Sequence, residues 1–386
     1  MESKKIYYGK QHIDNQDINE VTKALKNNLI TGGKYVKKFE NSCKKRVNSK
    51  FAYSCNSGTS AILLAYLAIG LKKNDVIIMP ALNFVAAANM AKLLKARIYF
   101  ADIDYLTGQI TPEKIIDCIK INKIKKIKVI LTMYLGGYPR LIKEFYYLKK
   151  KLKCFLIEDA CHAFGAKYIL NKNFYSIGSC KHSDICTFSF HPLKPITTGE
   201  GGLVTTNSKI IAKKIELFRS HGIIRKSTHW DYSVQFSGYN FRLSDINSAL
   251  GYSQLKKIDK FFKKRKFIYN FYQDFFNKFS FVKIIRIEKH TLPSFHLVIA
   301  LIDFSKMKID KNFFLKVLKS KNIFCQYHYI PIPRFKEFES KKFFYLKNTI
   351  KYYNNAVSLP IYNQLTNKDL RRITEEIIST LKKNLI

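Results

Sequence analysis

Lys194 follows a short apolar run, Ile185 to Phe188, and precedes the glycine-rich turn Gly199 to Gly202. A lysine amine attacks or holds an aldehyde only when its position is fixed and burial lowers its pKa, so that the neutral amine becomes accessible. A β-type run that ends near the lysine, closed by a turn, would supply such a position. Lysine is abundant in this chain, so composition alone favours an ordinary surface residue, and the other motifs must decide.

A second segment, Asn56 to Ser60, is suited to phosphate. It contains Ser57, Gly58 and Thr59 and stands before an apolar stretch that predicts a helix from Ser60 to Leu71. The positive N-terminus of a helix favours anions. The same residue types also cap helices that bind no ligand, and this segment alone favours that simpler interpretation.

Three further residues could contact an aromatic ring. Asp159 follows an expected strand, Cys154 to Ile157, and ligands of open α/β sheets bind at such strand ends. There it could pair with a protonated pyridine nitrogen; the alternative is a solvated turn acid. His162 could stack on the same ring or hydrogen-bond to it, and Phe84 could lie flat against it. Taken singly, both are more typical of core packing.

The four signals are stronger evidence together than any one of them is alone. A phosphate turn, a stacking aromatic, a strand-end aspartate and a strand-end lysine are the contacts that pyridoxal 5'-phosphate requires, and one α/β region contains them all. We expect no metal site, because the cysteine and histidine groups lack the paired spacing of zinc ligands; these are Cys154, Cys161 and His162, and Cys180, His182 and Cys186.

The segment from Asn56 to about Asn207 alternates β-rich runs with helical patterns, which predicts a mostly parallel sheet covered by helices. With 386 residues, the chain should form one large domain and a smaller one, since single cores stop growing near roughly 250 to 300 residues. We expect a large domain over 20–255 and a small one over 256–386, against which 1–19 would pack. The expected strands are Val76 to Met79, Arg97 to Ala101, Lys128 to Thr132, Cys154 to Ile157, Ile185 to Ser189 and Leu203 to Thr206, with helices at Ser60 to Leu71, Ile142 to Leu152 and Lys209 to Ser220.

The composition is strongly basic, with 68 Lys and Arg against 28 Asp and Glu, a net charge of +40. Such charge alone would suggest nucleic acid or an acidic membrane. The lysines are spread along the chain in short runs, however, so we expect no specific nucleic acid as partner. The longest apolar stretch, Ala61 to Leu71, is shorter than the roughly 20 residues of a membrane helix. A polar N-terminus and eight cysteines without paired spacing favour a cytoplasmic protein with reduced thiols.

These motifs resemble the DegT/DnrJ/StrS-type sugar aminotransferases nearly end to end. The matching segments are Asn56 to Ala61, Glu158 to Ala163, Ser189 to Lys194 and Gly238 to Leu243. The resemblance implies the α/β fold type I of aspartate aminotransferase, with a three-layer α/β/α large domain and a smaller C-terminal α+β domain. It also implies pyridoxal 5'-phosphate, covalently attached to Lys194.

The resemblance assigns further roles. Lys194, Asp159 and His162 would be catalytic, and Ser57, Gly58, Thr59, Phe84 and Ser189 would join them in binding the cofactor. Asn240 would reach the cofactor phosphate of a neighbouring subunit, which implies a homodimer with shared active sites. Substrate contacts are expected from His191, Arg242 and His328.

Several segments are most similar to a branch that aminates UDP-linked 4-keto-6-deoxy-N-acetylhexosamines of the L-arabino series, with L-glutamate as donor, for pseudaminic acid synthesis. They include Leu217 to Ile223, Gly238 to Asp259 and Gln326 to Ile332. The sequence departs from the family's pattern at Arg140, where an acidic residue is often found, and in the residues around His296. A sister aminotransferase acting on another epimer or nucleotide is the alternative. A sugar dehydratase of this fold would have histidine in place of Lys194, and a non-catalytic regulator would lack part of the motif set.

Overall fold

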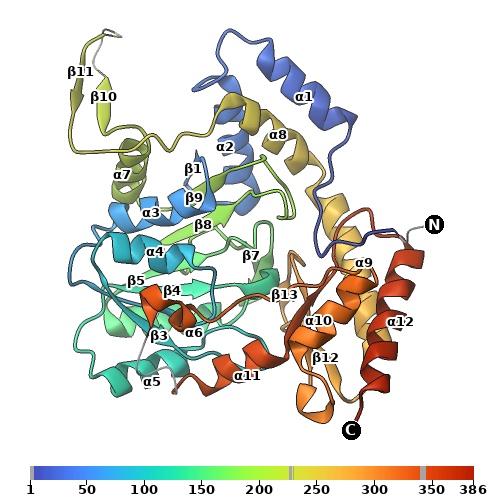
Figure 1. The fold of residues 1–386 in the computed structure, drawn as a ribbon. Helices are drawn as coiled ribbons and strands as arrows, with labels where there is room; N and C mark the ends of the chain where they lie inside the picture. The colour runs from blue at the N-terminus through green and yellow to red at the C-terminus, as the bar shows by residue number, and fades with distance from the viewer. Residues whose placement is uncertain (1–3, 226–227, 229, 340–344) are drawn as a thin grey trace.

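The computed structural model describes residues 4–225, 228, 230–339 and 345–386. A seven-stranded sheet with the order β1-β9-β8-β5-β4-β2-β3 forms its centre (Figure 1). Strands β8, β5, β4, β2 and β3 run parallel, and β9 is antiparallel to both of its neighbours. The strands are β1 (Phe51–Cys55), β2 (Val76–Pro80), β3 (Arg97–Ala101), β4 (Val129–Met133), β5 (Phe155–Asp159), β8 (Ile185–Ser189) and β9 (Gly202–Thr206).

Alternating side chains of these strands are buried on opposite faces of the sheet. Ile77 and Met79 belong to an apolar cluster with α3, α4 and α7, whereas Val76 and Ile78 pack with α5 and α6. This period of two is what a strand covered on both faces requires. The expected three-layer α/β/α arrangement is confirmed. The helices of this part are α1 (Asn15–Leu25), α2 (Lys34–Val47), α3 (Gly58–Ala68), α4 (Ala86–Leu93), α5 (Pro112–Asn122), α6 (Ile142–Leu152), α7 (Lys209–Arg219) and α8 (Asp245–Lys256).

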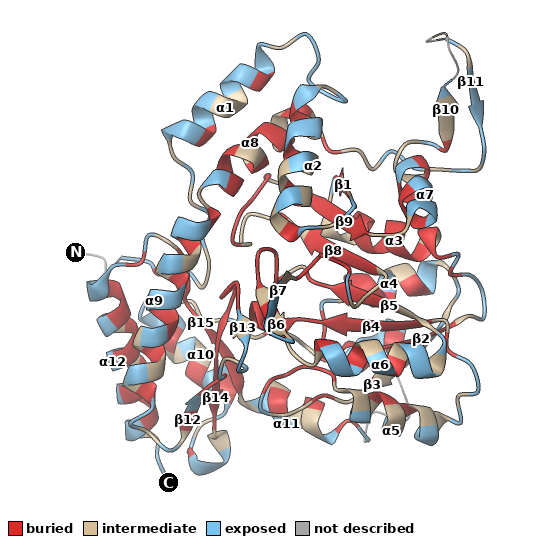
Figure 2. Ribbon diagram, turned by 180° about the vertical axis from the view of Figure 1, so that it is seen from behind, coloured by how far each residue is buried: buried red, intermediate tan, exposed pale blue. Residues whose placement is uncertain are grey.

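The C-terminal part is built on a second, antiparallel sheet, β12-β14-β15. Along β14, Val298 and Ala300 pack against α9, α10 and α12, whereas Ile299 faces Met133 of the large sheet. Figure 2 shows the inner strands of the large sheet, such as β4, and strand β14 of the second sheet as buried. The elements are α9 (Ile258–Phe276), β12 (Val282–Ile284), β14 (Val298–Ile302), η2 (Phe304–Lys306), α10 (Lys311–Ser320), η3 (Ile332–Arg334), η4 (Lys336–Phe338), α11 (Lys347–Asn355), β15 (Ala356–Leu359) and α12 (Asn367–Lys383).

Short elements connect or extend these two parts. The hairpin β10–β11 projects from the body of the molecule beside α7 (Figure 1). Strand β13 pairs with β6 and so links the C-terminal part to the large one. These elements are η1 (Leu135–Gly137), β6 (Lys167–Leu170), β7 (Asn173–Ser176), β10 (Ile223–Arg225), β11 (Tyr232–Val234) and β13 (Thr291–Leu292).

The N-terminal segment contacts the C-terminal part through backbone hydrogen bonds. The amide of Ile6 donates to Asn322 O at 2.8 Å, and the amide of Phe324 donates to Ile6 O at 2.8 Å. Ile6 itself is fully buried in the C-terminal apolar cluster. A division of the chain near residue 256, with 1–19 assigned to the smaller part, stays a prediction.

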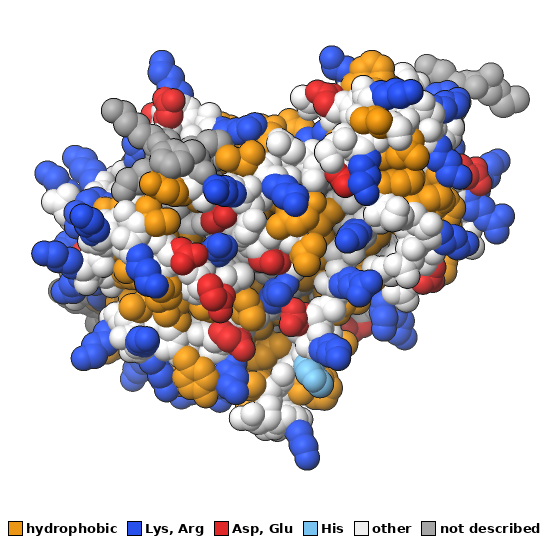
Figure 3. Space-filling view, turned by 90° about the horizontal axis from the view of Figure 1, so that it is seen from below, with side chains coloured by type: hydrophobic (Ala, Val, Ile, Leu, Met, Phe, Trp, Pro, Cys, Tyr) orange, Lys and Arg blue, Asp and Glu red, His pale blue; other side chains and the backbone are white. Residues whose placement is uncertain are grey.

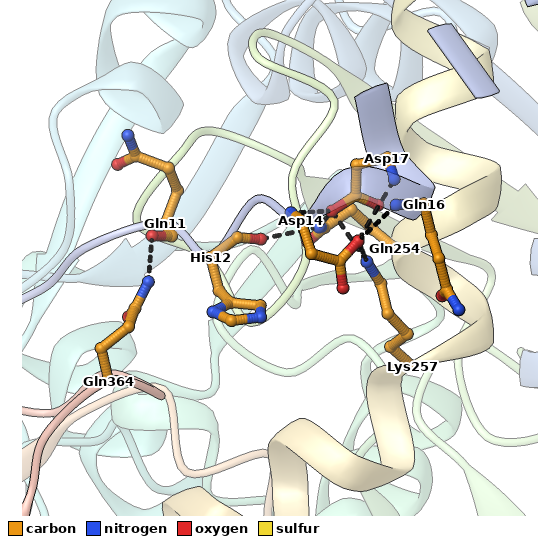
Figure 4. Close-up of polar contacts among 8 residues, drawn as sticks. All are labelled: Gln11, His12, Asp14, Gln16, Asp17, Gln254, Lys257 and Gln364. Carbon is orange, nitrogen blue, oxygen red and sulfur yellow. Dashed lines mark hydrogen bonds and ion pairs between the residues drawn. The ribbon is translucent and has the colours of Figure 1, made fainter. Parts of the chain in front are cut away.

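Two carboxylates tie the start of α1 to the junction between α8 and α9 (Figure 4). Asp14 caps α1, and Asp17 completes a capping box with it. Lys257 Nζ lies 2.7 Å from both Asp14 Oδ1 and Asp17 Oδ2, and Gln254 Nε2 donates to Asp17 Oδ2 at 2.6 Å. The fully buried charge of Asp17 is thus compensated where the chain passes from one part to the other.

The excess positive charge is distributed over the surface. On the face drawn in Figure 3, Lys and Arg side chains are scattered, with Asp and Glu side chains among them. Among the described helices, none is long and apolar enough to cross a membrane.

Candidate active site

A cavity of about 390 Å³ lies at the carboxyl ends of the parallel strands and beneath the N-terminus of α3. Most of the residues predicted from the sequence line it together, although they come from distant parts of the chain. They are Ser57, Gly58, Thr59, Phe84, Asp159, His162, Ser189, His191, Lys194 and His328.

The N-terminus of α3 is held close to the end of β8. Ser57 is the N-cap residue, and its Oγ accepts from the Ser60 amide at 3.0 Å. A Cβ at Gly58 would stand only 2.8 Å from Ser189 Cβ, so glycine permits this approach. The first amides of a helix have no partner within the helix, and here they lie at the wall of the cavity. The cap and the anion site expected from the sequence are therefore compatible.

The carboxylate of Asp159 is buried at the end of β5. Asn83 Nδ2 donates to its Oδ2 at 3.3 Å, and the Cys161 amide donates to its Oδ1 at 3.2 Å. Neutral donors hold this charge in place, because no Lys, Arg or His among the described residues forms an ion pair with it. A buried carboxylate of this kind favours a protonated ligand group opposite it.

Lys194 lies in a turn fixed by the backbone. Its amide donates to His191 O at 2.9 Å, and the Thr198 amide donates to Phe190 O at 3.0 Å. Burial lowers the pKa of the Lys194 amine, although its interactions with Cys161 and Asp159 act in the opposite direction. The neutral amine required for attack on a carbonyl is thereby made more accessible.

Three histidine rings form one wall of the cavity. The ring centroids of His162 and His296 are 4.2 Å apart, and those of His162 and His328 are 6.3 Å apart. Burial lowers the pKa of each, to about 3 for His328 and well below the usual range for the other two, and the charge of Lys194 adds to the effect. These rings are therefore neutral beside the lysine.

Asn240 and Arg242 lie outside this cavity. Asn240 is exposed and bridges to Ser220 near the base of the hairpin β10–β11, and Arg242 Nη1 donates to Ser220 Oγ at 3.0 Å. Arg242 lines a different hollow, together with Lys213 and His221. The predicted roles of both residues remain proposals.

The cavity also contains residues that the sequence analysis did not assign: Tyr8, Asn83, Cys161, His296 and Tyr329. Asn83 adjoins Phe84 in the loop after β2, so the strand-end rule that found Phe84 could have found it too. Tyr329 follows His328 directly. The residues around His296 differ from the family pattern, and nothing in the sequence indicates that His296 lies close to His162. Within the described residues, no group of three or more His, Cys, Asp and Glu is arranged to hold a metal ion.

Comparison with known proteins agrees with this geometry. Residues 11–378 match the model of the DegT/DnrJ/EryC1/StrS aminotransferase family. The chain belongs to this family. It is 38% identical to the UDP-4-amino-4,6-dideoxy-N-acetyl-beta-L-altrosamine transaminase of Campylobacter jejuni, with 98% of each chain covered. The solved structure of Helicobacter pylori PseC, an aminotransferase involved in pseudoaminic acid biosynthesis, matches with a TM-score of 0.90 and 29% identity, covering 98% of this chain and all of that one.

Pyridoxal 5'-phosphate is the cofactor that family membership indicates. A sugar aminotransferase of Streptococcus pneumoniae in its PLP form has the same fold, with a TM-score of 0.90 at 22% identity over 99% of this chain. The residues present fit this group: a buried carboxylate at Asp159, a lysine of lowered pKa at Lys194, and a helix N-terminus that Gly58 brings close to Ser189.

Proposed function

We propose that this aminotransferase moves the amino group of L-glutamate to the 4-keto carbon of a UDP-linked 4-keto-6-deoxy-N-acetylhexosamine of the L-arabino series. The product would be UDP-4-amino-4,6-dideoxy-N-acetyl-β-L-altrosamine, used for pseudaminic acid. The similarity that extends over 98% of the chain to the C. jejuni transaminase supports this substrate. The single structural observation that carries the proposal is the convergence of Lys194, Asp159 and the α3 N-terminus on one cavity. The cytoplasmic location expected from the sequence belongs to the same proposal.

The cofactor would be held by residues already placed around the cavity. Lys194 would bind its aldehyde, Asp159 would keep its ring nitrogen protonated, and Ser57, Gly58, Thr59 and Ser189 would receive its phosphate. His162 and Phe84 would contact its ring. When bound, pyridoxal 5'-phosphate acts as an electron sink that acidifies the α-hydrogen of an amine attached to it.

Lys194 would then carry the proton. As a neutral amine it would accept the proton from the α-carbon of the amino donor and release it to the carbon that carried the cofactor aldehyde, which is general acid–base catalysis by one group. Burial lowers the pKa of Lys194 and so favours the neutral amine, which is the form that can accept a proton. The buried carboxylate of Asp159 would face the ring nitrogen from the end of β5.

Substrate contacts would come from two copies of the chain. His191 and His328 line the cavity beside Lys194, whereas Asn240 and Arg242 lie outside it. We assign Asn240 to the cofactor phosphate and Arg242 to the substrate in the site of a second copy, which requires a homodimer. The exposed apolar side chains of the adjoining hairpin, Tyr232 and Val234, support burial of this region against another chain.

The test uses the amine form of the cofactor, prepared by treating the holoenzyme with glutamate. UDP-4-keto sugars of the L-arabino and D-xylo series are then added separately, and the absorbance of the aldehyde form is followed. Its return with the L-arabino sugar alone is the expected result. Return with the D-xylo sugar would reassign the enzyme to a sister reaction, and failure of glutamate to produce the amine form would contradict transamination itself.

A further inference from the structure

Three hydrogen-bonded groups lead from the backbone into the cavity. The amide of Gly136 donates to His162 Nδ1 at 3.2 Å. The other ring nitrogen, His162 Nε2, lies 2.8 Å from the hydroxyl oxygen of Tyr329. The His162 side chain is buried, so each ring nitrogen has one well-defined partner.

The first of these contacts fixes the direction of the second. A backbone amide can only donate, so His162 Nδ1 must present its lone pair, and a neutral imidazole then has its hydrogen on Nε2. The ring is neutral because burial lowers the pKa of His162 well below its usual range, and the charges of Lys194 and His328 lower it further. His162 Nε2 therefore donates, and the oxygen of Tyr329 accepts.

The hydrogen of the Tyr329 hydroxyl must then point elsewhere. Within the described part of the chain, this oxygen has His162 as its single hydrogen-bond partner, and Tyr329 lines the cavity. Burial raises the pKa of the phenol well above its usual range, and Asp159 and Cys161 raise it further. The hydroxyl thus keeps its hydrogen and offers the cavity a donor of fixed polarity.

We propose, on the basis of the function proposed above, that Tyr329 binds the sugar substrate by donating this hydrogen bond to one of its oxygens, with His162 as the residue that sets the polarity. Tyr329 enters the cavity from the segment after α10, whereas the groups assigned to the cofactor follow β1, β2, β5 and β8. A neutral phenol suits a neutral sugar oxygen. The carboxylates of glutamate are recognised best by cationic groups.

The variant Tyr329→Phe removes this hydroxyl and keeps the ring that lies against Phe84, with centroids 5.8 Å apart. In the holoenzyme, the two half-reactions are measured separately by cofactor absorbance. Calorimetry gives the affinities for UDP and for the UDP-amino sugar. We expect kcat/KM for the keto sugar and the affinity for the amino sugar to fall about tenfold, as for loss of one hydrogen bond in a buried site. The glutamate half-reaction and the affinity for UDP should be unchanged.

Tyr352→Phe is the matched control. Tyr352 belongs to the apolar cluster against which Tyr329 packs, its buried hydroxyl has no hydrogen-bond partner among the described residues, and it does not line the cavity. Both half-reactions and both affinities should stay at wild-type values in this control.

Two results with Tyr329→Phe would overturn the proposal. An unchanged preference for the amino sugar over UDP would show that the hydroxyl does not contact the sugar. An equal loss in the glutamate half-reaction would assign it to the cofactor or the donor. If the wild-type holoenzyme fails to react with glutamate, the proposed function fails instead, and the calorimetric comparison of the two nucleotides still decides the role of Tyr329.

Discussion

The side-chain amide of Asn83 donates a 3.3 Å hydrogen bond to the carboxylate of Asp159, and both residues are buried. The contact joins the loop after β2 to the end of β5, two strands separated by β4 in the sheet. A charge buried among neutral donors is costly unless a positive group completes the site. The pair therefore fits the role proposed for Asp159, which is to face a protonated ring nitrogen.

Asp159→Asn should remove the negative charge of this side chain with little change in its shape. We expect turnover to fall by roughly a hundredfold or more, because the charge proposed to face the ring nitrogen would be an electrostatic contribution in place before the reaction begins. Steady-state kinetics with glutamate and the keto sugar measure the loss. Asn83→Ala, which removes one donor and leaves the charge, should lose less, about tenfold. Equal losses in the two variants would show that geometry, and not charge, is what Asp159 supplies.

The proposed sharing of active sites between two copies predicts complementation between two inactive variants. Lys194→Ala removes the reacting amine, and Asn240→Ala removes the contact assigned to the second copy. In a mixed dimer one site has both substitutions and the other has neither. Activity should therefore reappear after the two purified variants are mixed and allowed to exchange subunits. Mixtures that stay inactive while mass spectrometry detects mixed dimers would place Asn240 outside the partner's site.

The buried histidines predict a loss of stability in mild acid. His162, His296 and His328 have lowered pKa values in the folded protein, whereas the unfolded chain binds their protons below about pH 6.5. As the pH falls through this value, the unfolded state gains protons that the folded state excludes. The free energy of unfolding then decreases by about 1.4 kcal/mol per pH unit for each histidine.

His296→Gln isolates one of these contributions, because glutamine does not titrate. Urea unfolding of the holoenzyme between about pH 5 and pH 6 should show a pH dependence shallower by one histidine's share in this variant than in the wild type. Parallel pH dependences would indicate that His296 is protonated in the folded protein.

Lys257 is predicted to stabilise the attachment of the N-terminal segment. It lies 2.7 Å from the carboxylates of Asp14 and Asp17, and Lys257→Met would leave the buried charge of Asp17 without its cation. The free energy of unfolding should fall by about 3 kcal/mol. Lys256→Met is the control, because that lysine is exposed and lies 3.9 Å from Glu20, an arrangement worth less than about 1 kcal/mol. Similar losses in urea unfolding for the two variants would contradict this role.

The sequence predicted those parts of the site that depend on neighbours along the chain. The six strands expected around Lys194 and Asp159 occur within one or two residues of their predicted bounds, because apolar runs and strand-end polar residues are local signals. Strand β1 was not predicted: it enters the sheet beside β9, and Phe51 to Cys55 has no clear pattern alone.

Contacts between distant segments could not be predicted in the same way. Tyr329 and His162 are hydrogen-bonded although they are 167 positions apart in the sequence. His296, which lies just before β14, contacts the same histidine ring. Both residues lie outside the strands, and their approach to His162 depends on packing between the two sheets. Asn83 is different, because it precedes Phe84 in the loop after a predicted strand and could have been predicted with it. Only its hydrogen bond to Asp159 could not be predicted without the structure.

Transfer of the amino nitrogen itself tests the central claim most directly. Glutamate isotopically labelled at its amino nitrogen is incubated with the holoenzyme and the L-arabino UDP-4-keto sugar, and the sugar nucleotide is analysed by mass spectrometry, with Lys194→Ala as the blank. The label should appear in a UDP-4-amino sugar with the wild type and not with the variant. A sugar without label, or equal labelling by Lys194→Ala, would contradict the assignment.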